Sequence, residues 1–179
     1  MSEGPMAAGG TEPVGAKQTY ILFNVAGTAY AVPSQQVLHM EMLEQVTAVP
    51  NAPEFVEGVV FSRGQVVPAI NMRARFGFER APLDVASRLL VVQTKGRSVG
   101  LLVDGCREFL TVPQSAIHPP GEALSGLSAQ YVDGVASVGD RLIVVLGLDR
   151  LLGSTEHVVG TPPQQQGSGE GHGYTKTRS

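Results

Sequence analysis

Residues 55–77 read FVEGVVFSRGQVVPAINMRARFG, and residues 131–153 read YVDGVASVGDRLIVVLGLDRLLG. The two stretches align without a gap at a constant offset of 76 positions, so that Gly58 falls on Gly134. Both contain two apolar, β-branched runs separated by a short turn, which is the pattern of a β-hairpin. The chain therefore contains the same hairpin twice, and its fold is predicted to consist of two halves of similar plan.

A second repeated pattern lies upstream of the repeated hairpin. Residues 20–32 match residues 89–101, with a glycine turn between two apolar runs in each copy. Helical patterns are short, at residues 72–76, where Asn71 is the expected N-cap, and at residues 148–152. The segments that we expect to form strands include 18–25, 29–32, 88–94 and 97–103.

These patterns predict an all-β protein made of two related barrels packed side by side. A half of this size can close its own small barrel and so remove most sheet edges. We place the boundary near residue 82, with one subdomain over 18–82 and the other over 83–153. The ends, 1–17 and 154–179, carry few large apolar groups and are expected to be disordered. Pro68 lacks an N–H group, so its strand is predicted to be an edge or to be bulged there.

Composition restricts the class of function. Hydrophobic residues make up 42% of the 179 positions, and the formal net charge is −3. Nucleic-acid and membrane-surface partners require a basic footprint, which is missing. The longest apolar run, Leu142 to Leu146, is too short to span a bilayer. With a single cysteine, Cys106, and no apolar leader, the sequence favours a cytoplasmic protein without membrane insertion.

The sequence contains no recognisable catalytic motif. The four histidines do not fall at metal-ligand spacings, and no nucleophile elbow or phosphate loop is present. Cys106 aligns with Val37 of the other half, which favours a small apolar strand residue over a reactive thiol. We therefore predict a non-enzymatic protein with no catalytic residues, metal or cofactor. An uncharacterised enzyme and a small-barrel nucleic-acid binder remain as alternatives.

Three motifs carry a family resemblance: FVEGVVFSRGQVVPAINMR, VGLLVDGCREFL and YVDGVASVGDRLIVVLGLDRLL. In this order they resemble the CheW-like domain of bacterial chemosensory signalling, and the resemblance covers residues 18–153. It implies two SH3-like five-stranded β-barrel subdomains with short terminal helices. It also implies an adaptor that couples the cytoplasmic tip of methyl-accepting chemotaxis receptors to the regulatory domain of a CheA-type histidine kinase. Such a protein is cytoplasmic and is recruited to membrane-associated receptor arrays.

The chain departs from the family pattern at several positions. The usual Asn-Leu-Arg-Gly is Phe61-Ser62-Arg63-Gly64, an aspartate is replaced by Asn71, and a glutamate by His39. These changes keep open a paralogous role in a separate chemosensory pathway, for example one driving pili or gliding. The partner-binding residues that the resemblance implies are Val37, His39, Gly58, Phe61, Arg63 and Gly64.

Arg63 marks the main difference between the two copies, since the second hairpin turns through Gly139-Asp140. Gly64 is expected to supply the positive φ of the first turn, and no turn requires a long guanidinium. Arginine is a frequent interface anchor, so a partner contact is the favoured role of Arg63. Phe61 either lines the same surface or packs between the two subdomains.

Overall fold

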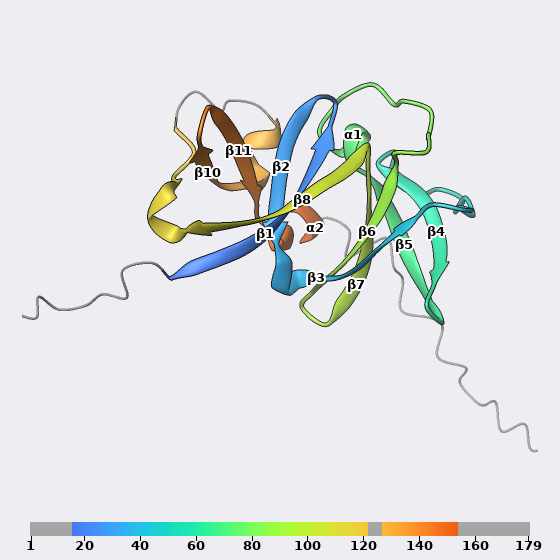
Figure 1. The fold of residues 1–179 in the computed structure, drawn as a ribbon. Coiled ribbons are helices and arrows are strands. Elements are labelled where there is room, and N and C mark those ends of the chain that lie inside the picture. Colours follow the sequence, from blue (N-terminus) through green and yellow to red (C-terminus); the bar gives the residue numbers. More distant parts are fainter. Residues whose placement is uncertain (1–15, 122–126, 154–179) are drawn as a thin grey trace, which may run out of the picture.

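The structure is a computed structural model that describes residues 16–121 and 127–153. The ends predicted to be disordered lie outside these ranges, apart from Ala16 and Lys17. Most described residues belong to strands of two sheets, one on each side of the view in Figure 1, with α2 between them. The all-β class predicted from the sequence is confirmed.

The six-stranded sheet has the order β8-β1-β2-β11-β10-β9. All its neighbours are antiparallel except β2 and β11, which run parallel. Its strands are β1 (Lys17–Val25), β2 (Thr28–Pro33), β8 (Gly105–Pro113), β9 (Ile117–His118), β10 (Val132–Val138) and β11 (Arg141–Leu146).

The five-stranded sheet has the order β3-β6-β7-β5-β4, with β5 and β7 as its parallel pair. Its strands are β3 (Val37–Met42), β4 (Val56–Ser62), β5 (Gln65–Asn71), β6 (Arg88–Thr94) and β7 (Arg97–Val103). The short helices are η1 (Ser34–Gln36), α1 (Met72–Arg75), η2 (Gln114–Ala116), η3 (Leu127–Tyr131) and α2 (Leu148–Leu152).

The strands are not divided between the sheets at residue 82, so the predicted boundary is wrong for the described chain. The five-stranded sheet is built from one continuous segment, β3 to β7, which is inserted between β2 and β8 of the six-stranded sheet. Each repeat begins with a hairpin, β1–β2 in the first repeat and β6–β7 in the second. The hairpin β1–β2 pairs with β8 and β11 of the second repeat, and β6–β7 pairs with β3 and β5 of the first. The exchange is possible because both hairpins present similar apolar strands to their neighbours.

The number of strands also differs from five in one of the sheets. The sixth strand, β9, has two residues and pairs with β10 through His118 and Val135. At the corresponding place in the five-stranded sheet there is only an isolated bridge between Thr47 and Val59. Both sheets therefore follow one plan, and β9 is a slightly longer version of a contact that they share.

The largest group of buried apolar residues lies between the sheets rather than inside either of them. It combines β1 and β2, including Phe23, with β6 and β7, including Leu101, and with both helices. Two smaller clusters fill the six-stranded and five-stranded sheets separately. Because burial of apolar surface is the main favourable term in folding, the two sheets form one folding unit.

The two α-helices follow equivalent strands and meet at the centre of the molecule. Asn71 caps α1, as predicted, by accepting a hydrogen bond from Ala74 N at 3.1 Å. Arg75 of α1 lies against the Phe55 ring at 4.2 Å and the Tyr131 ring at 4.8 Å. These two aromatic residues are repeat partners, so one guanidinium joins the two copies through cation–π contacts.

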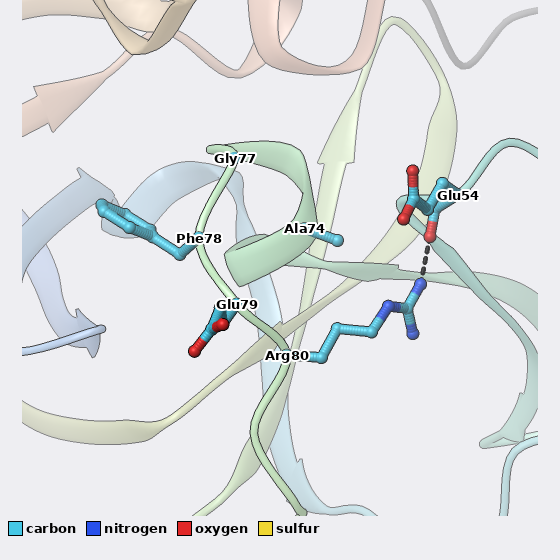
Figure 2. A pocket seen from close by; sticks show the side chains of 6 residues that line it. All are labelled: Glu54, Ala74, Gly77, Phe78, Glu79 and Arg80. Atoms are coloured by element: carbon cyan, nitrogen blue, oxygen red, sulfur yellow. Dashed lines mark hydrogen bonds between the residues drawn. The ribbon is translucent and has the colours of Figure 1, made fainter.

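The connection from α1 to β6 is tied back to the five-stranded sheet. Arg80 points toward Glu54 and donates to its backbone oxygen (Figure 2). The same guanidinium pairs with the Glu57 carboxylate of β4 at 2.5 Å. The chain is thereby held close to the sheet before β6 begins.

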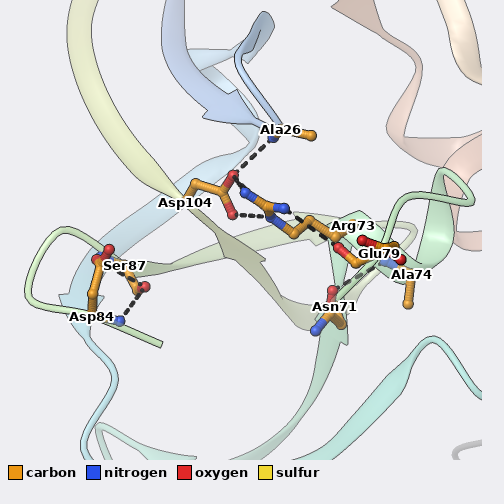
Figure 3. Close-up of polar contacts among 8 residues, drawn as sticks. All are labelled: Ala26, Asn71, Arg73, Ala74, Glu79, Asp84, Ser87 and Asp104. Atoms are coloured by element: carbon orange, nitrogen blue, oxygen red, sulfur yellow. Dashed lines mark hydrogen bonds and ion pairs between the residues drawn. The ribbon is translucent and has the colours of Figure 1, made fainter. Parts of the chain in front are cut away.

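Asp104 lies where the chain leaves β7 and enters β8, and so passes between the sheets. Its carboxylate accepts hydrogen bonds from Ala26 N at 2.8 Å and from Arg73 Nη2 at 2.7 Å, and Arg73 Nε lies 2.8 Å from its other oxygen (Figure 3). Burial alone would raise the pKa of Asp104, but the hydrogen bonds from Arg73 and Ala26 and the charge of Arg73 hold it below the ordinary value. The carboxylate joins the β1–β2 turn to α1.

Pro68 does not lie on an edge strand, because β5 is between β7 and β4 in the sheet order. Pro68 pairs with Val59 of β4, whereas the ladder to β7 begins only at Ala69. The missing N–H therefore interrupts no hydrogen bond on the β7 side, and the proline is accommodated inside the sheet.

Separating the chain at the repeat boundary is predicted to abolish folding of both pieces. A fragment of residues 16–82 lacks the partners of β1–β2, and a fragment of 83–153 lacks those of β6–β7. Neither should show a cooperative transition in denaturant unfolding followed by circular dichroism, whereas the uncut 16–153 chain should. A cooperative transition in either isolated fragment would show that the strand exchange is dispensable.

Asp104→Asn should reduce stability at pH 7 by about 1–3 kcal/mol, because the charge-assisted bonds to Arg73 are lost. A carboxyl whose pKa is lowered on folding stabilises the protein above its unfolded pKa, near 4, and this contribution disappears as pH falls through the lower folded value. The variant should therefore lose less stability than wild type between pH 5 and 3 in urea unfolding. Asp140→Asn, at an exposed turn, is the control, and an acid dependence equal to wild type in Asp104→Asn would contradict the assignment.

Candidate protein-binding surface

The turn between β4 and β5 presents Arg63 at its tip. Arg63 has φ 46° and Gly64 has φ 82°, the two positive angles of a type I′ hairpin turn. The β6–β7 turn has the same signs at Lys95 and Gly96. The predicted positive φ at Gly64 is confirmed, but Arg63 also adopts the left-handed region, which costs a non-glycine residue about 1–2 kcal/mol. The residue at the tip is thus an arginine held in a backbone conformation that is unfavourable for it.

Beside the tip, apolar side chains face away from the core. Phe61 is 74% exposed, and its cross-strand partner Val66 is 66% exposed. The alternative that Phe61 packs between the subdomains is therefore excluded. Val60 and Val67 point to the other face and are buried.

Strand β3 continues the exposed apolar surface. Its residues alternate in burial, so that Leu38, Met40 and Met42 are exposed while His39 and Glu41 are half-buried. β3 is an edge strand of the five-stranded sheet. Exposed apolar groups that gather in one region, unlike scattered ones, mark an interaction surface.

Arg63 lies between two grooves. The inter-sheet groove, about 400 Å³, runs between β3 and β8, and the side groove, about 430 Å³, lies along β4. Within the described part of the chain no hydrogen bond or ion pair engages the Arg63 guanidinium. The inter-sheet groove is lined by residues that include Ile21, Val37, Leu38, His39, Met40, Arg63, Cys106, Arg107 and Phe109, and the side groove by residues that include Glu41, Met42, Val59, Phe61 and Arg63.

A polar cluster lies directly under the tip. His39 Nε2 is 2.8 Å from Ser62 Oγ and 3.3 Å from Glu41 Oε2, and Ser62 donates to Glu41 at 3.0 Å. A nucleophilic triad needs the carboxylate on the imidazole nitrogen opposite the serine. Here the carboxylate and the hydroxyl meet the same nitrogen, and Ser62 is buried. The cluster is not arranged for nucleophilic catalysis.

Gly58 lies outside both groove linings but supports one wall. A Cβ at this position would lie 2.1 Å from Thr47 O, and the φ of Gly58 is +153°. Thr47 pairs with Val59 through two backbone hydrogen bonds, at 2.9 and 2.8 Å. Glycine is required because the backbones approach closely, so any effect of Gly58 on binding is indirect, through Thr47, which lines the side groove.

Cys106 lies on the inter-sheet groove at the position equivalent to Val37. Its thiol donates to Leu22 O at 3.4 Å, and burial raises its pKa. A raised pKa disfavours the thiolate, which is the nucleophilic form. The side chain therefore contributes packing to the groove floor, as the sequence analysis expected of a small apolar strand residue.

A third hollow, about 610 Å³, lies beside α1, and Figure 2 shows its lining residues. Glu54, Glu79 and Arg80 make it mainly polar, and Arg80 is already engaged by Glu54 and Glu57. Among residues 16–121 and 127–153 no group of three His, Cys, Asp or Glu side chains is placed to hold a metal ion. In the same ranges no helix is long and apolar enough to cross a membrane.

The structure brings together most of the residues singled out from the sequence. Val37, His39 and Arg63 line the inter-sheet groove, Phe61 and Arg63 line the side groove, and Gly64 completes the tip. Sequence reasoning missed Leu38, Met40 and Phe109. The alternation in VLHMEM was a usable signal for the first two, whereas the position of Phe109 depends on the pairing of β8 with β1.

An exposed apolar surface with an unpaired arginine at its centre is typical of a protein–protein contact, in which aromatic residues, methionine and arginine are enriched. The fold and the site therefore define an all-β protein-binding domain.

The CheW-like domain pattern matches residues 19–156. The chain is 30% identical over 139 residues to the chemotaxis protein CheW of Klebsiella aerogenes, covering 78% of this chain and 84% of that protein. It is 28% identical to the protein FrzA of Myxococcus xanthus, and the match covers 76% of this chain and 86% of FrzA. The crystal structure of the scaffolding protein TtCheW from Thermoanaerobacter tengcongensis superposes on this structure with a TM-score of 0.70 at 27% identity. The match covers 75% of this chain and 92% of TtCheW.

The chain belongs to the CheW-like domain family. This is a family of chemotaxis adaptor and scaffold proteins, so the resemblance inferred from the three motifs is confirmed.

Gly58→Ala should destabilise the protein by about 3 kcal/mol, because the new Cβ collides with the Thr47 backbone, which must move. Gly64→Ala is the matched control, since its φ is also positive but nothing lies within 4 Å of the added Cβ. It should cost about 1 kcal/mol. Thermal and urea unfolding measure both, and equal losses in the two variants would contradict the close-approach role of Gly58.

Proposed function

We propose that this protein is a non-enzymatic adaptor that couples methyl-accepting chemotaxis receptors to the regulatory domain of a CheA-type histidine kinase. Family membership supports the adaptor role, and the unpaired Arg63 between two grooves is the observation that supports a binding site here. The protein acts in the cytoplasm and is recruited to membrane-associated receptor arrays through its partners.

The chemistry of the surface limits what can bind. The inter-sheet groove offers Leu38, Met40 and Phe109 as apolar contacts, while Arg63 offers a planar set of donors. An apolar segment that carries a carboxylate or exposed backbone carbonyls fits both features. The cytoplasmic tip of a receptor and the regulatory domain of the kinase are the two partners to test.

Each residue proposed for partner binding has a distinct part. Arg63 and Phe61 contact the partner, Gly64 allows the turn that exposes them, and Val37 forms the groove wall. His39 acts beneath the tip, and Gly58 keeps Thr47 and β4 together.

The relative FrzA supports a second candidate, in which the adaptor serves a separate chemosensory pathway, for example one for pili or gliding. The replacements at Phe61-Ser62, His39 and Asn71 relative to the usual family pattern favour the same candidate. Co-purification from native cells decides between the two, because the kinase recovered identifies the pathway.

Arg63→Gly should separate binding from stability. The variant removes the guanidinium and the left-handed strain together, so stability should be unchanged or rise by up to about 1 kcal/mol. Affinity for at least one partner, the kinase regulatory domain or a receptor tip fragment, should weaken by roughly 1–2 kcal/mol, or about 5- to 30-fold, as for an interface anchor. Thermal melting and calorimetric titration measure the two quantities.

Lys95→Gly is the matched control for Arg63→Gly. Lys95 occupies the same left-handed position of the β6–β7 turn and lines neither groove. It should show the same change in stability with no change in affinity. If Arg63→Gly binds both partners as wild type does, Arg63 has no role in recognition.

A further inference from the structure

The two edges of the five-stranded sheet are joined under the Arg63 tip by side chains. β3 and β4 are the terminal strands in the sheet order, and no backbone ladder between them is present in the described chain. His39 and Glu41 of β3 instead contact Ser62, the last residue of β4. The cluster therefore closes the sheet at the residue that precedes Arg63.

The hydrogen bonds fix the protons in this cluster. A serine hydroxyl has one hydrogen, and Ser62 donates it to Glu41, because a carboxylate only accepts. Nε2 of His39 must therefore be the donor to Ser62 Oγ. The remaining nitrogen, Nδ1, is the one that gains or loses a proton. When it is protonated, the ring carries a positive charge with Nε2 only 3.3 Å from Glu41 Oε2.

The other repeat makes the equivalent connection with permanent charges. The alignment that places Val37 on Cys106 places His39 on Glu108, and Glu108 of β8 pairs with Arg141 of the β10–β11 hairpin at 3.0 Å. Glutamate and arginine both stay ionised across the neutral range. Histidine changes charge between about pH 5 and 8. Of these two equivalent closures in the described chain, only the one beneath Arg63 contains a histidine.

The charges around His39 determine the sign of the effect. Glu41 is the carboxylate in contact with it, and its side chain is 28% exposed. Arg63 on the tip and Arg107 and Glu108 on β8 line the same groove, but Glu108 is engaged by Arg141. The contact at 3.3 Å dominates over more distant charges, so protonation strengthens the link between β3 and the tip.

We propose that His39 is a proton-responsive positioning residue: its protonation locks the β4–β5 tip onto β3 and so strengthens binding of the partner that Arg63 contacts. The proposal rests on the proposed function for its partner. A tip held in place loses less conformational freedom on binding, which is the basis of preorganised recognition. The added positive charge in the groove also favours the carboxylate-bearing segment inferred above. Both effects make binding tighter at lower pH.

The first measurement needs no partner. Amide hydrogen exchange of residues 60–66 is followed in the full chain at pH 6 and pH 8, with rates corrected for intrinsic exchange. Wild type should show about 3-fold or greater extra protection of the tip at pH 6. His39→Gln keeps a neutral donor but cannot be charged, so its protection should not change with pH. A pH dependence that persists in His39→Gln would overturn the proposal.

The second measurement uses the two probes already named, the kinase regulatory domain and a receptor tip fragment. Wild type should bind at least one of them about 3- to 10-fold more tightly at pH 6 than at pH 8, and His39→Gln should bind it equally at both. Glu41→Gln removes the carboxylate and with it the locking contact, so the difference between the two pH values should become smaller than in wild type, which provides a second test if His39→Gln folds poorly. Asp140→Asn, at the exposed turn of the β10–β11 hairpin and outside both groove linings, should retain the wild-type profile.

The outcomes separate the two proposals. If wild type binds neither probe at either pH, the proposed function fails, while the exchange measurement still decides the role of His39. If binding is tight but its pH profile is the same in wild type, His39→Gln and Glu41→Gln, the role of His39 is refuted and the adaptor function stands. Melting temperatures of all variants at both pH values confirm that folded proteins are compared.

Discussion

The carboxylate of Asp104 joins three chain segments that the sequence separates widely. It holds the β1–β2 turn through Ala26 and α1 through Arg73, and the backbone N–H of the same residue donates to Asn24 O of β1. The inserted five-stranded sheet is thereby fixed at the point where the chain returns to the six-stranded sheet. The inter-sheet groove depends on this arrangement, since its walls, β3 and β8, belong to different sheets.

Two copies of one plan provide the framework, and recognition arises where the copies differ. A Cβ added at Gly58 would lie 2.1 Å from Thr47 O, and one added at Gly134 would lie 2.9 Å from His118 O, so a backbone approaches the glycine closely in each sheet. The tip, in contrast, carries Arg63 in one copy and Gly139 in the other. A repeated fold can in this way keep the packing of both halves while only one half acquires a long cationic side chain at its hairpin tip.

Local structure could be predicted from the sequence because its causes are local. The strands at residues 88–94 and 97–103 and the cap at Asn71 follow from β-branched runs, a glycine turn and an amide at a helix start. Strand pairing could not be predicted, because the repeat makes β1–β2 and β6–β7 chemically similar partners for either sheet. The contact between His39 and Ser62 could not be predicted for the same reason, because it requires knowing that β3 and β4 are the two edges of one sheet.

The insertion of one sheet into the other also imposes an order on biosynthesis. Every strand of the five-stranded sheet has been made once Val103 leaves the ribosome, but β1 and β2 must wait for β11, which ends at Leu146. Until then Leu22 and Ala31, on one face of the first hairpin, lack Ile143 and Val145, with which they form a buried cluster. The long sequence separation of these contacts makes folding slow. The nascent chain is consequently most prone to aggregation, and most in need of a chaperone, through its first strands rather than its last.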